Sequence, residues 1–194
     1  FVSAPIYSSV SGTVAKIDTS IDATGYRKPV IIINVEGDEW EESIDRSEKL
    51  ETLDEHSELT PENIIDIIKR AGITGMGGAG FPAFIKLCPP PTAKAECIII
   101  NGVECEPYIT ADYRLMMEHA KEILVGLDLL MKAAKVKRGY IGIEENKPEA
   151  IKLFTQLTAD DSRIEVVPLI QKYPQGGEKQ LVHAVIKRQV PAPP

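Results

Sequence analysis

Hydrophobic positions in the second half of the chain alternate between short apolar runs and longer stretches with helical periodicity. Three runs are short, uninterrupted and rich in β-branched residues, which is typical of buried strands. They span residues 97–101, 140–143 and 164–167. Helical patterns follow the three runs over residues 112–135, from residue 146 and over residues 177–187. Strand and helix in regular alternation predict an α/β fold whose β/α units form a parallel sheet.

A further helix is predicted upstream of these units. Thr60 and Pro61 supply an N-cap and a proline at the first helical position, and Glu62 places an acid in the first turn. Isoleucines then recur at helical spacing until Gly72, a residue that favours helix ends. From Gly72 to Gly80 the chain has five glycines in nine residues.

The first forty residues have the pattern of a small β unit. Apolar and polar residues alternate around Gly12, and a β-branched run, PVIIINVEG, lies between Pro29 and Gly37. We therefore expect a small β unit over residues 1–40, an acidic linker over 41–59 and an α/β domain over 60–194.

Charge is distributed unevenly along the chain. Residues 36–58 hold eleven acidic side chains against two basic ones, a local charge of −9, so the remainder carries +2 of the total of −7. Such a tract is usually solvated, and it argues against nucleic-acid binding, which needs a basic surface. No apolar run approaches the ~18 residues of a membrane helix, so we expect no direct membrane insertion. The absence of an initial methionine and the final VPAPP cluster suggest a piece of a longer protein.

The glycine-rich segment is the first candidate for chemistry. Residues 75–80 satisfy the pattern GxGxxG, but a helix precedes them where the dinucleotide fingerprint needs a strand, and no Lys-Ser/Thr pair follows as in a Walker A loop. Glycines still let backbone N–H groups face a phosphate, and Lys86 can add a positive charge. The alternative is a flexible surface loop that binds no ligand.

Two further segments lie where strands end, at the rim where parallel sheets bind ligands. One is Asn101–Pro107, with Glu104 and Glu106, and the other is Tyr173–Glu178, with two adjacent glycines. Taken alone, the acids are as consistent with solvated loop residues. The three histidines and three cysteines show no ligand spacing, so we assign them no role and predict no metal site.

Together, the three motifs resemble a known family. GMGGAGFPAFIKL, NGVECEPYITADYRLM and YPQGGEKQL occur in the order found in the flavin- and NADH-binding subunit of respiratory complex I. They look most like the C subunit of the Rnf electron transport complex, an ion-translocating NAD:ferredoxin oxidoreductase. The segment APIYSSVSGTVAKID is similar to the hammerhead, or barrel-sandwich, β segment that precedes this domain in that family.

The resemblance implies a role for each matching residue and no catalytic acid, base or nucleophile. Lys86 would lie beside the flavin, Asn101 and Glu104 would hydrogen-bond FMN, and the glycines would form a flavin loop and an open flavin face. These glycines are Gly75, Gly77, Gly78, Gly80, Gly176 and Gly177. NADH would be bound by Phe81, Glu106 and Glu178, and hydride would pass between NAD(H) and FMN.

This chain departs from the complex I pattern at three positions. Met76, Val103 and Gly177 stand where those relatives carry Arg, Asp and Glu, which removes three polar contacts. The resemblance also places paired asparagines, a β-grasp domain and the iron–sulfur clusters beyond Pro194. It implies a peripheral subunit at the cytoplasmic face of the membrane, with the other Rnf subunits as partners and ferredoxin as an indirect one.

Two other functions remain open at this stage. One is a scaffold or assembly module of the same complex whose flavin pocket stays empty. The other is a glycine loop that binds a different phosphate ligand, which would give nucleotide binding without flavin absorbance.

Overall fold

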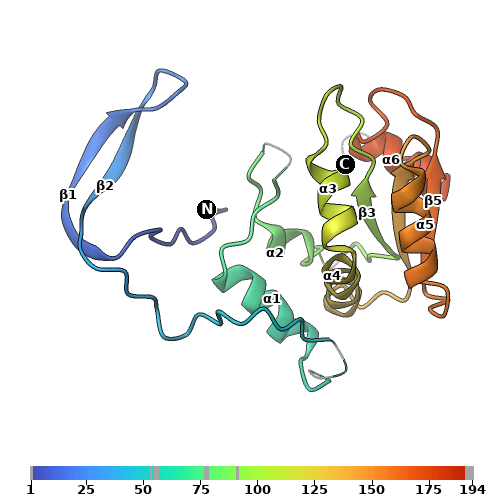
Figure 1. Ribbon diagram of the computed structural model, residues 1–194, viewed down its shortest axis with the longest axis horizontal. Coiled ribbons are helices and arrows are strands. Elements are labelled where there is room, and N and C mark those ends of the chain that lie inside the picture. Colours follow the sequence, from blue (N-terminus) through green and yellow to red (C-terminus); the bar gives the residue numbers. More distant parts are fainter. Residues whose placement is uncertain (1, 53, 55–56, 77–78, 91, 191–194) are drawn as a thin grey trace. The chain divides into compact units, whose positions relative to one another are not determined.

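The computed structural model of the protein describes residues 2–52, 54, 57–76, 79–90 and 92–190 (Figure 1). The chain divides into two compact units. The smaller one spans residues 5–49, and the larger one spans residues 50–194 together with residues 1–4. The domain limits expected from the sequence stay a prediction.

The smaller unit is built on a β-hairpin. Strand β1 (Gly12–Ile21) pairs antiparallel with β2 (Arg27–Val35), and the register is irregular between Val14 and Lys16. Gly12 has φ +147°, and a side chain there would collide with the carbonyl of Asn34, so glycine is required at this position. Most residues of both strands are exposed, and among the described residues the two strands close no barrel.

In the larger unit, the predicted first helix is present as α1 (Pro61–Arg70). Its N-terminus is a capping box in which the Thr60 hydroxyl accepts a hydrogen bond from the Asn63 N–H and Asn63 Oδ1 accepts one from the Thr60 N–H. Ile64 is buried and packs with Leu87 and Ala133. The cap and the apolar stripe together explain why the helix begins and lies where it does.

The centre of the larger unit is a parallel sheet of three strands in the order β3-β4-β5. These strands are β3 (Ile98–Gly102), β4 (Gly139–Glu144) and β5 (Ile164–Leu169). The helices in the second half of the chain are α3 (Ala111–Glu118), α4 (Ala120–Ala133), α5 (Pro148–Leu157) and α6 (Glu178–Ile186). The α/β fold with a parallel sheet is therefore confirmed.

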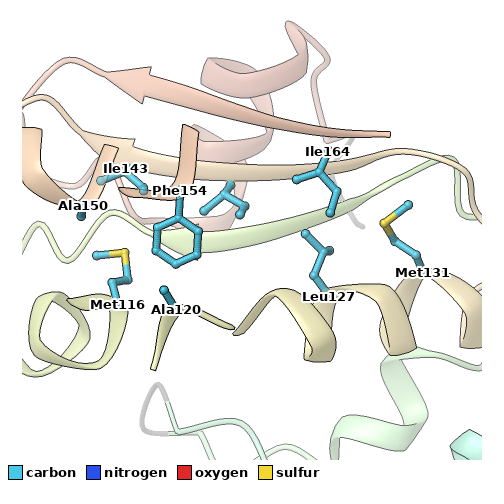
Figure 2. Packing of buried hydrophobic residues seen from close by; sticks show 9 residues of the cluster. Met116, Ala120, Leu127, Met131, Ile143, Ala150, Phe154 and Ile164 are labelled. Carbon is cyan, nitrogen blue, oxygen red and sulfur yellow. The ribbon is translucent and has the colours of Figure 1, made fainter. Parts of the chain in front are cut away.

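Helices cover both faces of the sheet. Figure 2 shows Leu127 of α4 and Phe154 of α5 packed with Ile143 and Ile164 of the strands in the main core. On the other face, Leu181 of α6 packs with residues of the alternate strand positions, including Leu169. Successive strand residues point to opposite faces, and helices cover both faces. Both sets of alternate residues are therefore apolar, which explains the continuous hydrophobic runs in the sequence.

The single long helix predicted over residues 112–135 is wrong in one respect: it is two helices separated at His119. This residue has φ −127° and ψ 34°, so it leaves the helical conformation. Its N–H still donates to the Leu115 carbonyl at 2.8 Å, and its carbonyl accepts from Ile123 N–H at 3.1 Å. Met116 and Ala120, on either side of the break, are both buried in the main core.

No helix within the described parts of the chain is long and apolar enough to cross a bilayer.

Candidate functional site

The glycine-rich segment forms a hairpin that is closed at its base. Gly75 N–H donates to the Phe81 carbonyl at 2.8 Å, and Ala83 N–H donates to the Ile73 carbonyl at 2.9 Å. Gly80 has φ +59°, a conformation that glycine adopts without strain. Two of the residues assigned to the flavin loop, Gly77 and Gly78, lie outside the described residues.

Lys86 lies beside this hairpin. It is the last residue of α2 (Ala83–Lys86), and its Nζ is 3.6 Å from the position that a Cβ on Gly75 would occupy. Phe81, the proposed nicotinamide contact, is 40% exposed in the same hairpin. The hairpin thus combines side-chain-free backbone with a cation and an accessible aromatic ring, a set that suits a phosphorylated aromatic ligand.

The second and third motifs meet at the rim of the sheet. Asn101 Nδ2 donates to the Gly176 carbonyl at 2.9 Å, and Gly176 N–H donates to Cys105 Sγ at 3.3 Å. Asn101 Oδ1 also accepts a hydrogen bond from Val103 N–H at 3.3 Å. Because β3 and β5 both end at this edge, the parallel topology brings together residues that are far apart in the sequence.

Glu104 has a structural contact that the sequence did not indicate. Its carboxylate accepts hydrogen bonds from Asp112 N–H at 2.6 Å and Tyr113 N–H at 3.1 Å, the free amides in the first turn of α3. It is 7% exposed and has φ +47°. The carboxylate therefore acts as the N-cap that Thr110, whose side chain makes no cap hydrogen bond, does not provide.

A buried ion pair at the end of β4 was also missed by sequence reasoning. Lys147 Nζ donates to the carbonyls of Val103 at 2.7 Å and Glu104 at 3.3 Å, and it lies 3.8 Å from Glu144 Oε2. Glu144 Oε1 accepts from the N–H of Lys172 at 3.2 Å. The only signal in the sequence was a charged residue directly after a buried strand.

A cleft of about 380 Å³ opens at this rim. Residues from the loops after β3, β4 and β5 contribute to its wall. The lining residues are Glu104, Cys105, Glu106, Pro107, Tyr108, Ile109, Thr110, Tyr113, Glu144, Asn146, Lys147 and Gln171. Glu106, assigned to NADH, is exposed in this wall, and Glu178, also assigned to NADH, is the exposed first residue of α6.

The adjacent glycines lie at the turn that leads into α6. Gly177 is the N-cap of α6, and a Cβ on Gly176 would lie 3.4 Å from Cys105 Sγ and 3.6 Å from Asn101 Oδ1. Buried Gln175, the preceding residue, has a side-chain oxygen with no hydrogen-bond partner among the residues that the structure describes. The Asn101 amide and the Gln175 oxygen, which lie beside these glycines, are groups that can hydrogen-bond the polar edge of a flavin.

The site residues therefore fall into two groups. One is the hairpin with Gly75, Gly80, Phe81 and Lys86, and the other is the rim with Asn101, Glu104, Glu106 and residues 176–178. Within the described residues, no hydrogen bond joins the hairpin to the rim loops.

Comparison with known proteins agrees with the resemblance seen in the motifs. The family model of the Nuo51 FMN-binding domain matches residues 68–194. The chain is 42% identical over 193 residues to the C subunit of the Na⁺-translocating ferredoxin:NAD⁺ oxidoreductase complex of Acetobacterium woodii, covering 99% of this chain and 42% of that protein. It is 43% identical over 194 residues to the C subunit of the proton-translocating ferredoxin:NAD⁺ oxidoreductase complex of Clostridium ljungdahlii, covering 99% of this chain and 41% of that protein.

A solved structure supports the fold. The larger part of the chain, 63%, superposes on 23% of a chain in the crystal structure of an NAD⁺-reducing [NiFe]-hydrogenase in the H₂-reduced state, with a TM-score of 0.54 and 22% sequence identity. The chain spans about two fifths of the length of the Acetobacterium woodii and Clostridium ljungdahlii relatives. With the family model matching well over half of its residues, the chain belongs to the Nuo51 FMN-binding domain family.

Proposed function

We propose that this chain is the FMN- and NADH-binding portion of an ion-translocating ferredoxin:NAD oxidoreductase complex, in which hydride is exchanged between NAD(H) and FMN. The observation that carries the proposal is the hydrogen bond from Asn101 to the Gly176 carbonyl. It brings two of the three motifs to the ligand-binding rim of a parallel sheet, in a chain of an FMN-binding family.

The glycine hairpin is proposed to hold the phosphate and the ring of FMN. The Gly75 N–H closes the base of the hairpin, and other backbone N–H groups of this glycine-rich segment would approach the phosphate, since glycines carry no side chain. Lys86 supplies a positive charge beside Gly75. Gly77 and Gly78 belong to the same proposed loop.

The rim is proposed to hold the polar edge of the flavin. Asn101 and Glu104 present hydrogen-bonding groups, and Gly176 and Gly177 would leave one ring face open because they carry no side chain. Glu104 is fixed by the N-terminus of α3, so any contact it makes with FMN comes from a carboxylate that is already held in place. That arrangement favours binding because little side-chain motion has to be lost.

NADH is proposed to bind on the open face. Phe81 stacks against the nicotinamide nucleotide, while the carboxylates of Glu106 and Glu178 accept hydrogen bonds from its polar groups. Bound FMN supplies the hydride chemistry, and the protein supplies orientation and proximity. No acid, base or nucleophile of the chain is required.

The relatives are named as subunits of multi-subunit complexes that translocate ions, so we propose the other subunits of such a complex as partners. Electrons would reach ferredoxin indirectly, through iron–sulfur clusters in the remaining part of the longer protein. The place of action would be the cytoplasmic face of the membrane.

The proposal is tested by titrating the chain with FMN and, separately, with riboflavin, and following the flavin fluorescence. We expect saturable quenching by FMN and weaker binding of riboflavin, which lacks the phosphate that the hairpin and Lys86 would hold. Absence of saturation with FMN would contradict the proposal and favour a scaffold with an empty pocket. Binding of AMP without binding of FMN would instead indicate a site for another phosphate ligand.

A further inference from the structure

The ion pair of Lys147 and Glu144 is the most deeply buried charged feature at the rim. The Lys147 side chain is 9% exposed and that of Glu144 is 2% exposed. Burying two charges costs several kcal/mol per ion before their attraction and hydrogen bonds are counted. A pair of apolar residues of similar size is often equally stable or more stable at such a place, so stability alone is a weak reason for this pair.

The contacts of the pair extend to the loops on both sides of β4. Lys147 Nζ binds the carbonyls of Val103 and Glu104, which belong to the loop after β3. These are the residues that lead into Cys105 and Glu106 in the cleft wall. Lys147 therefore holds the backbone of the loop after β3, residues 101–107, at the end of β4.

Glu144 makes the matching contact on the other side. Its Oε1 accepts a hydrogen bond from Lys172 N–H, in the loop after β5 that leads to Gln175 and Gly176. Because β4 is the middle strand, one ion pair at its end holds both flanking loops to the same point of the sheet. The hydrogen bond from Asn101 to the Gly176 carbonyl also joins the two loops directly to each other.

We propose that Lys147 and Glu144 are a positioning pair that sets the spacing of the two rim loops, residues 101–107 and 170–178, and thereby the affinity of the site for FMN. The link to FMN rests on the proposed function, whereas the effect on loop spacing does not. Ligand-contacting groups require support from a surrounding layer of this kind, since a displacement of about 1 Å is enough to impair a site.

The test replaces both charges at once, because removal of a single partner would leave an unpaired buried charge and can unfold the protein. The double variant Lys147→Met/Glu144→Leu keeps the approximate volume of the pair and removes its contacts to both loops. The control is Lys152→Met/Glu165→Leu, which makes the same chemical changes at two exposed positions of α5 and β5. Urea unfolding, amide hydrogen exchange and FMN titration are measured for both variants and for the unchanged chain.

We expect the Lys147→Met/Glu144→Leu variant to unfold at a urea concentration close to that of the unchanged chain. Its FMN dissociation constant should rise about 10- to 100-fold, the loss of affinity found when residues that orient metal ligands are replaced. Amides of residues 101–107 and 170–178 should exchange faster without ligand, while those of α1 and α4 stay unchanged. The control should match the unchanged chain in all three measurements.

Two results would overturn the inference. Unchanged exchange in both loops without ligand would show that the pair does not position them, whether or not the chain binds FMN. Faster exchange in both loops with an unchanged FMN dissociation constant would show that the pair has no effect on the flavin site. If the unchanged chain itself bound no FMN, the proposed function would fail, and the exchange measurement alone would decide whether the pair positions the loops.

Discussion

The side-chain amide of Asn101 donates to the carbonyl oxygen of Gly176, a residue 75 positions later in the chain, at 2.9 Å. Gly176 returns a hydrogen bond from its N–H to Cys105 Sγ. Two motifs on separate β/α units are thus joined by two hydrogen bonds, and the missing side chain of Gly176 lets its backbone pack against Asn101 and Cys105. This junction makes the rim a single site.

Asn101→Ala is expected to weaken FMN binding about tenfold, since the amide both ties the two loops together and is proposed to contact the flavin. Asn101 is exposed, so the free energy of unfolding should fall by only about 1 kcal/mol, the usual value of one hydrogen bond. Fluorescence titration and urea unfolding measure the two effects. Asn34→Ala, at an exposed position of β2, is the control. If neither variant changed the FMN affinity, the assignment of Asn101 to the flavin site would be contradicted.

Lys86→Met is expected to reduce FMN affinity about tenfold, because charge-assisted contacts to phosphate are stronger than neutral ones. Riboflavin binding should not change, and the dependence of FMN affinity on salt concentration should become weaker. Lys94→Met serves as control, since Lys94 is exposed and lies outside the glycine hairpin. Equal losses for FMN and riboflavin would show that Lys86 does not act through the phosphate.

Glu178→Ala is expected to raise the dissociation constant for NADH more than that for FMN. Glu178 is an acid in the first turn of α6, so its removal also takes away a favourable interaction with the helix dipole. Glu149→Ala removes the same interaction in the first turn of α5, at a residue that does not itself line the cleft. If the two variants lowered NADH affinity alike, the assignment of Glu178 would be wrong.

Asp161 provides a pH-dependent contribution to stability. The Arg163 guanidinium, hydrogen-bonded to Asp161 at 2.6 and 2.9 Å, lowers the pKa of that carboxyl below its usual value. A lowered pKa in the folded state means that the stabilisation is present above the unfolded-state pKa and is lost as pH falls through the folded-state pKa.

Asp161→Asn should therefore reduce the free energy of unfolding at neutral pH, and the difference from the unchanged chain should shrink as the solution is made acidic. Urea unfolding at a series of pH values measures this difference. A difference that stays constant down to acidic pH would show that the charge of Asp161 does not contribute.

Much of the fold could be predicted because its signals are local. Thr60, Pro61 and the isoleucine stripe define α1 within a dozen residues, and the β-branched runs of the sheet are unambiguous. The parallel topology then required that the loop of Asn101 and the loop of Gly176 share one rim. That the two loops lie at the same edge of the sheet follows from the parallel direction of the strands and does not depend on particular side chains.

Other features depend on tertiary contacts that leave no pattern in the sequence. The break at His119 could not be read from the sequence, because the helical periodicity continues through it. Glu104 caps a helix that begins seven residues later, beyond the range of any capping motif. Lys147 is buried through contacts with backbone carbonyls of a different β/α unit. Every residue has such a carbonyl, so the sequence does not indicate which ones accept a hydrogen bond from a lysine.

The most direct test of the account is anaerobic addition of NADH to the FMN-loaded chain while the visible absorbance of the flavin is followed. We predict that the absorbance falls as NADH is oxidised, with a rate that saturates at high NADH concentration and is slower in Glu178→Ala than in Glu149→Ala. An absorbance that stays constant with FMN bound and NADH in excess would contradict the claim that these residues bring the two nucleotides together for hydride exchange.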